Sequence, residues 1–126
     1  RFHTAINKFC LQACMNESLT IWKTAFNQKR PYLGLDDFNK VIIHIITKKL
    51  IKNDLYNILS HNLKVSDIVK TINQRKKIKK IFVNNPIMNQ LSYSISNEKF
   101  CATGFKFKSN LKLEINKTIN QLIKIS

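Results

Sequence analysis

The chain is poor in glycine, with only Gly34 and Gly104 among its 126 residues. A dinucleotide-binding turn of the form Gly-x-x-Gly-x-x-Gly needs three, because the backbone must approach the cofactor pyrophosphate closely. Residues 1–126 therefore contain no such cofactor turn.

Acidic residues are also scarce, with seven against 22 basic ones and a formal net charge of +15. Such a charge ordinarily favours nucleic acid or an anionic surface as a partner. Nineteen of the basic residues are Lys spread along a chain rich in Ile and Asn, and only residues 75–80 form a cluster. A solvated helix end explains that cluster better than a nucleic-acid patch. A small basic nucleic-acid-binding module stays open as the alternative function.

Cysteine is limited to three residues without a metal-type pair, which predicts reduced thiols in a cytoplasmic protein. Cys10 and Cys14 are four residues apart, and we predict two small core residues rather than a metal site with His3. No apolar run approaches the ~20 residues of a membrane span, and the start has no signal-peptide character. Because the first residue is Arg1, we expect the sequence to begin inside a longer protein.

What is present is an alternation of helical and extended patterns in a chain that is 44% hydrophobic, which predicts one α/β unit spanning 1–126. Asp36 or Asp37 is the expected N-cap of one helix, and Ser66-Asp67 that of another. The first of these helices has an apolar stripe that we expect in the core, formed by Phe38, Val41, Ile42, Ile45 and Ile46. The predicted helices are 4–16, 36–49, one beginning at 66–67, 97–103 and 111–123; the predicted strands or extended segments are 19–22, 30–33, 54–59, 80–83 and 92–95.

Two segments carry a family resemblance, Asn27-Gln28-Lys29-Arg30-Pro31-Tyr32-Leu33-Gly34-Leu35-Asp36-Asp37 and Asn85-Pro86-Ile87-Met88-Asn89-Gln90-Leu91-Ser92-Tyr93. With Tyr56-Asn57 and Gly104-Phe105, they resemble the carboxy-terminal, substrate-binding part of extended short-chain dehydrogenases/reductases, the NAD-dependent nucleotide-sugar epimerase/dehydratase family. Trp22, Asp37 and Lys99 also fall on family positions. Many relatives have Arg-Pro-Gly where this chain has Asn85-Pro86-Ile87, so an amide pair, Asn89-Gln90, would serve in place of that arginine.

The resemblance implies a complete enzyme that binds NAD or NADP, oxidises a sugar carbon by hydride transfer and returns the hydride after a further step. This chain would position the nucleotide-sugar substrate, and an amino-terminal cofactor-binding half would be its missing partner. A homodimer of the complete enzyme is compatible with the resemblance. None of Tyr32, Tyr56 and Tyr93 has a lysine four residues later, so the Tyr-x-x-x-Lys acid/base pair that the resemblance implies for the complete enzyme is not encoded here. For this chain alone we expect no cofactor and no catalytic residue.

The expected substrate-binding residues are Arg30, Trp22, Tyr93, Asn7, Asn89 and Gln90. A guanidinium is a planar fork of donors that matches two phosphate oxygens, so Arg30 would hold the diphosphate. Its alternative is an ion pair with Asp36 or Asp37. Trp22 would stack on a base or sugar, or else belong to the core. The amides would bind sugar hydroxyls, and the resemblance adds Tyr93. His44, within an apolar run, is expected to be a satisfied, partly buried histidine rather than a general base.

Overall fold

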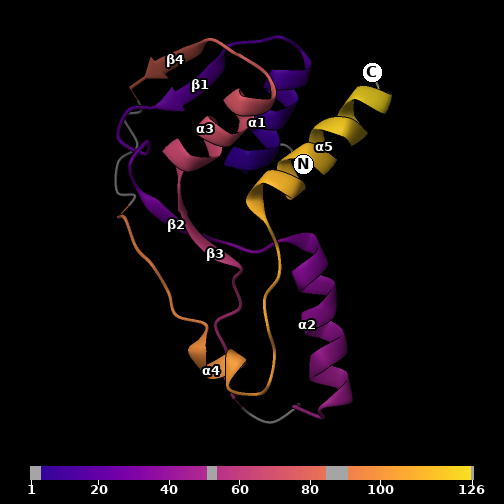
Figure 1. The fold of residues 1–126 in the computed structure, drawn as a ribbon. Coiled ribbons are helices and arrows are strands. Elements are labelled where there is room, and N and C mark those ends of the chain that lie inside the picture. The colour runs from indigo at the N-terminus through magenta and orange to yellow at the C-terminus, as the bar shows by residue number, and fades with distance from the viewer. Residues whose placement is uncertain (1–3, 51–53, 85–90, 126) are drawn as a thin grey trace.

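The structure, a computed structural model, describes residues 4–50, 54–84 and 91–125. It combines helices with short strands, so the predicted α/β class is confirmed (Figure 1). No helix in these ranges is long and apolar enough to cross a membrane. The helices are α1 Ala5–Cys14, α2 Leu35–Thr47, α3 Val65–Arg75, α4 Glu98–Cys101 and α5 Leu111–Ile125; the strands are β1 Leu19–Trp22, β2 Lys29–Tyr32, β3 His61–Lys64 and β4 Lys80–Val83.

Two small sheets organise the chain. β1 pairs in parallel with β4, from Leu19 opposite Lys80 to Trp22 opposite Val83. β2 pairs antiparallel with β3, with Arg30 opposite Leu63. Pro31 has no backbone donor, which a strand bonded on one side tolerates. The predicted strands at 19–22, 30–33 and 80–83 are thus confirmed within one residue.

The larger hydrophobic core lies where α1, α3 and α5 meet β1. The period of about 3.6 residues in each helix places its apolar residues on one side, which is why the sequence predicted these helices. Cys10 is a fully buried member of this core, and Cys14 packs against it. Both thiols are free. The buried members of this core are Phe9, Cys10, Ala13, Leu19, Ile21, Val65, Ile68, Val69, Ile72, Ile115 and Ile119.

A smaller aromatic core holds α2 to the segment around α4. Its buried members are Val41, Phe100 and Phe105, with Tyr56 and Ile58 packed against them. His44 lies at the edge of this core, 2.9 Å from the Thr103 hydroxyl and edge-to-face with Phe100 and Phe105. The prediction of a satisfied, half-buried histidine is confirmed.

The predicted core stripe of α2 is wrong in most of its members. Val41 is buried and Ile45 partly so, but Phe38, Ile42 and Ile46 are exposed. The aromatic core packs against the side with Val41 and Ile45, and neither buried cluster of the described residues includes Phe38, Ile42 or Ile46. The sequence pattern identifies the apolar residues of this helix but does not show which of them pack against another element.

The predicted strand at 54–59 is also wrong, and Tyr56-Asn57 is not on a strand. The strand begins later, at His61, and pairs with β2. Residues 92–95, predicted as a brief extended segment, lie in no helix or strand, and the Tyr93 N–H donates to the carbonyl of Lys29 at 3.3 Å. Segment 54–59 is strand-like in sequence, but no strand pairs with it within the described residues.

The predicted helix caps need correction as well. Gly34 is the N-cap of α2, and Asp36 and Asp37 lie in its first turn. Lys64, not Ser66, is the N-cap of α3, and the Asp67 carboxylate accepts a hydrogen bond from its N–H at 3.0 Å. Carboxylates in a first turn still favour a helix, since they face the positive end of its dipole.

Candidate functional site

A pocket of about 290 Å³ opens between α1, β1, β2 and the start of α3. Its walls mix aromatic and apolar side chains with two cationic ones, and none of the described lining residues is acidic. This combination suits an anionic ligand that also has a flat or apolar part. The residues that line it are Ala5, Lys8, Phe9, Thr20, Trp22, Ala25, Gln28, Arg30, Tyr32 and Val65.

Three contacts order the guanidinium of Arg30. Its Nη1 donates to the carbonyl of Lys29 at 2.8 Å, and its Nη2 donates to Oε1 of Gln28 at 3.0 Å. The guanidinium carbon lies 5.0 Å from the centre of the Tyr93 ring. A guanidinium has five N–H donors, so these contacts leave donors for a ligand. A side chain that is already ordered loses less conformational freedom on binding.

Lys8 and Trp22 complete the polar and aromatic character of the pocket. Lys8 comes from α1 and brings a second positive charge to the lining of the pocket. Trp22 ends β1 and is 39% exposed, which leaves ring surface open to the pocket. Tyr32 is half-buried, and burial raises the pKa of its hydroxyl although the nearby Arg30 opposes the shift. Tyr32 therefore stays a neutral donor near neutral pH.

The structure brings together three of the six predicted site residues. Arg30 and Trp22 line the same pocket, and Tyr93 contacts Arg30. Asn7 lines a different, open groove of about 1150 Å³ between α1, α5 and the start of α2. Asn89 and Gln90 lie outside the described residues. Sequence reasoning did not select Lys8, because nothing in the sequence distinguishes it from the eighteen other lysines.

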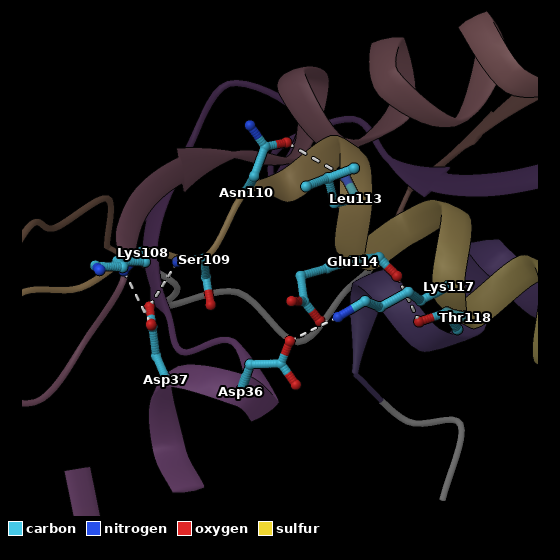
Figure 2. Close-up of polar contacts among 9 residues, drawn as sticks. All are labelled: Asp36, Asp37, Lys108, Ser109, Asn110, Leu113, Glu114, Lys117 and Thr118. Atoms are coloured by element: carbon cyan, nitrogen blue, oxygen red, sulfur yellow. Dashed lines mark hydrogen bonds and ion pairs between the residues drawn. The ribbon is translucent and has the colours of Figure 1, made fainter. Parts of the chain in front are cut away.

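The alternative role of Arg30, an ion pair with Asp36 or Asp37, is wrong within the described part of the chain. Asp36 pairs instead with Lys117, Oδ2 to Nζ at 2.6 Å, which joins the start of α2 to α5 (Figure 2). The hydrogen bond from Lys117 lowers the pKa of the Asp36 carboxyl, and the same contact raises the pKa of Lys117. Neither aspartate competes with a ligand for the Arg30 guanidinium.

Asp37 is a fully buried carboxylate that accepts three hydrogen bonds. The Ser60 hydroxyl donates at 2.7 Å, and the backbone N–H groups of Lys108 and Ser109 donate at 2.9 Å each. Figure 2 shows Asp37 pointing at the backbone of these last two residues. Burial raises the pKa of the carboxyl, but the hydrogen bonds outweigh it, and the pKa is held below its ordinary value. Asp37 fixes the start of α2, the segment before β3 and the segment before α5 relative to one another.

Within the described ranges, the remaining cationic, thiol and carboxylate groups form no second site. The basic run is divided, since Arg75 donates to Oδ1 of Asn120 at 3.2 Å and Lys76 is half-buried. Burial raises the pKa of Cys10 to about 12, so this thiol is not a nucleophile at neutral pH.

Lys99, one of the residues on which the sequence resemblance was based, pairs with Asp54, and its Nζ lies 5.0 Å from the centre of the Tyr56 ring. In the described residues no group of three or more His, Cys, Asp and Glu is placed to hold a metal ion.

Comparison with solved structures identifies the fold. The chain matches UDP-glucuronic acid 4-epimerase from Bacillus cereus, solved as a Tyr-to-Phe mutant with NAD and a fluorinated UDP-glucuronic acid. The match covers 100% of this chain and 41% of that one, with a TM-score of 0.84 and 17% identity. UDP-glucose 4-epimerase from Thermotoga maritima matches over 97% of this chain and 40% of its own, with a TM-score of 0.80 and 16% identity.

A monomeric L-threonine 3-dehydrogenase from a metagenome matches in the same way, with a TM-score of 0.76 and 16% identity over 96% of this chain and 41% of that chain. The chain thus spans about 40% of the length of these proteins and has the fold of their carboxy-terminal part. No protein-family profile and no curated protein sequence matches it. Because one fold serves both nucleotide sugars and an amino acid, the substrate must be argued from the pocket.

Proposed function

We propose that this chain is the substrate-binding part of an NAD(P)-dependent nucleotide-sugar epimerase/dehydratase of the extended short-chain dehydrogenase/reductase family. Its role is to hold the nucleotide and its diphosphate while a separate cofactor-binding part carries out the hydride transfer. In this proposal Arg30 binds the diphosphate, Lys8 adds a second charge, and Trp22 contacts the base or sugar. Asn7, Tyr93, Asn89 and Gln90 remain proposed substrate contacts.

The observation that carries the proposal is that Arg30, Lys8 and Trp22 line one pocket. A diphosphate needs charge-assisted donors, and a base or sugar ring needs an aromatic or apolar wall. The pocket volume of about 290 Å³ lies at the lower limit for small-ligand sites, roughly 300 Å³. The pocket would therefore hold part of a sugar nucleotide, and the second part of the enzyme would enclose the rest.

The residues of this chain do not fit the cofactor. Gly104 ends a helical turn with φ of 92°, and the Cβ position of Gly34 is occupied by the Ser109 side chain, so neither glycine opens a place for a pyrophosphate. Nothing in residues 1–126 supplies the Tyr-x-x-x-Lys pair. We accordingly assign binding and orientation to this chain, and no catalytic step.

Calorimetric titration with UDP and with uridine tests the proposal on the protein that contains residues 1–126. UDP should bind more tightly than uridine, because the difference between them is the diphosphate. Arg30→Ala should abolish most of that difference, whereas Arg75→Ala, the matched control on α3, should leave it unchanged. Equal affinities for UDP and uridine would refute the proposal. Tight binding of a DNA or RNA oligonucleotide that Arg75→Ala weakens would favour the basic-module alternative.

A further inference from the structure

β4 has an open edge on the side away from β1. N–H groups at the start of β1 and just after its end donate to the carbonyls of Lys79 and Val83, at 2.8 and 3.1 Å. Successive residues of a strand direct their backbone groups to opposite sides, so Ile81 also faces β1, whereas Lys80 and Phe82 face away from it. No backbone group of these two residues is hydrogen-bonded within the described ranges. We call their N–H and C=O groups the free edge of β4.

The opposite edge of the same sheet is already occupied. The Thr20 N–H donates to Oε1 of Gln12 at 3.4 Å, and the Trp22 carbonyl accepts from the Ala25 N–H at 3.1 Å. In Figure 1 β4 is the outermost strand at the top left, with β1 on its inner side. An edge strand with unpaired backbone groups is a template for a further strand. Within the described part of this sheet, a strand can therefore be added only beside β4.

The side chains of β4 are apolar and exposed on both sides of the strand. Ile81 and Phe82 are each 43% exposed, although adjacent residues of a strand point to opposite faces. The Phe82 ring lies edge-to-face with Phe26, with 5.2 Å between the ring centres. A strand added at the free edge would cover part of both exposed side chains, because cross-strand neighbours pack against each other. The edge thus provides apolar contact area as well as hydrogen bonds.

The charges around the free edge are all positive. Lys77, Lys79 and Lys80 form the part of the basic run that leads into β4, and all three are exposed. The ion pairs of the described ranges are made by Lys99 and Lys117, so none of these three lysines belongs to one. Lysine at a sheet edge opposes the pairing of two identical edges, since like charges would meet. The same charges attract a strand that carries carboxylates.

We infer that the free edge of β4 is a docking surface for an extended acidic segment of a partner protein. The segment adds as a strand beside Lys80–Phe82, with its backbone bonded to the free edge, its carboxylates near the lysines and its apolar side chains over Ile81 and Phe82. The inference does not depend on the proposed function, because no residue of β4 lines the pocket that holds Arg30.

The other occupants fit the edge less well. A second copy of this chain would bring its own lysines and a net charge of +15 to the same edge. The phosphates of a nucleic acid would pair with the lysines, but phosphate oxygens only accept hydrogen bonds and would leave the two carbonyls of the free edge without a donor. A peptide strand supplies both donors and acceptors.

Backbone hydrogen exchange, followed by NMR on the isotope-labelled protein that contains residues 1–126, tests the inference. The probe is the acetylated, amidated peptide Glu-Val-Glu-Val-Glu-Val. It should slow the exchange of the Lys80 and Phe82 amides by at least about tenfold, and change that of Ile81 much less, because the Ile81 amide faces β1. No binding at millimolar peptide, or binding without protection of these two amides, would overturn the inference.

Two further probes identify the chemistry of the partner. The peptide Lys-Val-Lys-Val-Lys-Val has the same pattern with the opposite charge and should leave both amides unprotected. Equal protection by the two peptides would refute the requirement for an acidic partner. A short oligothymidylate should also leave them unprotected, and protection by it in place of the acidic peptide would assign the edge to nucleic acid and overturn the inference.

A charge reversal checks the role of the lysines. Lys80→Glu should weaken binding of the acidic peptide by about threefold or more, because a cross-strand attraction becomes a repulsion. Lys112→Glu, at an exposed position of α5, changes the net charge equally and should have little effect, since salt screens distant charges. Equal weakening in both variants would show that only the net charge of the protein matters, and would refute docking at the edge.

A second pair of variants isolates the backbone. Phe82→Ala loses the ring but keeps the outward N–H, whereas Phe82→Pro loses both. Since β1 does not use this N–H, an edge strand tolerates the proline, and equal melting temperatures of the two variants would confirm that it does. The acidic peptide should bind Phe82→Pro about fivefold or more weaker than Phe82→Ala. Equal affinities would overturn the inference, and the Lys80→Glu comparison tests it without a proline.

Discussion

The Ser60 hydroxyl bridges the buried Asp37 carboxylate and the start of α2, donating to Asp37 at 2.7 Å and accepting from the Gly34 N–H at 3.0 Å. Together with the bonds from Lys108 and Ser109, this contact joins three segments that are distant in the sequence. A buried carboxylate with three donors is stable only while all of them remain in place. The first predictions concern this junction.

Asp37→Asn should destabilise the protein strongly. The amide keeps the shape of the carboxylate but loses its charge, and its NH2 group would face a backbone N–H donor that needs an acceptor. We expect a loss on the order of 2–4 kcal/mol in the free energy of unfolding, measured by urea denaturation. Asp36→Asn, one residue away and exposed, is the control and should have a much smaller effect. Similar losses in the two variants would contradict the assigned role of Asp37.

Acid should remove the contribution of Asp37. Its folded-state pKa lies below the ordinary value of 3.8, because the hydrogen bonds outweigh the effect of burial. A lowered folded pKa stabilises the protein above the unfolded pKa, and that stabilisation is lost as the pH falls through the folded pKa. The stability difference between wild type and Asp37→Asn should therefore be constant near neutral pH and shrink below about pH 4. A difference independent of pH down to pH 2 would show that the carboxylate charge has no role.

Glycine is needed at position 34 because the space for a side chain is limited, and not because the backbone conformation there requires glycine. Its φ is −71°, which any residue adopts, but an added Cβ would lie 2.0 Å from Ser109 Oγ and 2.6 Å from Ser109 Cβ. Gly34→Ala should therefore destabilise the protein by about 1–3 kcal/mol, seen as a lower melting temperature. Ser109→Gly in the same chain should restore part of the loss. Gly104→Ala, with φ of 92° and open space around the new Cβ, should not be rescued by Ser109→Gly.

The elements that the sequence predicted correctly have their determinants close together in the chain. α1, β1, β4 and α5 show their period of apolar residues within one short window. The failures depend on distant partners. The residues next to Asp37 in the sequence predict a helix N-cap, but its hydrogen-bond partners lie 23, 71 and 72 residues away. Segment 54–59 has the pattern of a strand, but a strand also needs a neighbouring strand.

The candidate site could be predicted only in part for the same reason. Arg30 was selected because arginine is rare in this chain and adjacent to Pro31. Trp22 and Arg30 belong to strands of different sheets, and only the fold shows that they line one pocket. Lys8 is one of nineteen lysines, and nothing in the sequence distinguishes it from the others. Its position on α1 beside the pocket becomes visible once the helix is packed.

Arg30 provides the sharpest test of the proposed substrate, in the proposed complete enzyme, where a second part would close the site. If Arg30 binds the diphosphate as proposed, Arg30→Ala should remove one or two charge-assisted hydrogen bonds, about 1.5–3 kcal/mol, or roughly tenfold to a hundredfold in the dissociation constant of the sugar nucleotide. Arg30→Lys should recover only part of this, since an ammonium keeps the charge but loses the planar fork. The melting temperature should change little, because the contacts to Gln28 and Lys29 are local. Unchanged substrate affinity with a lowered melting temperature would instead make Arg30 a structural residue that only orders β2 and Tyr93.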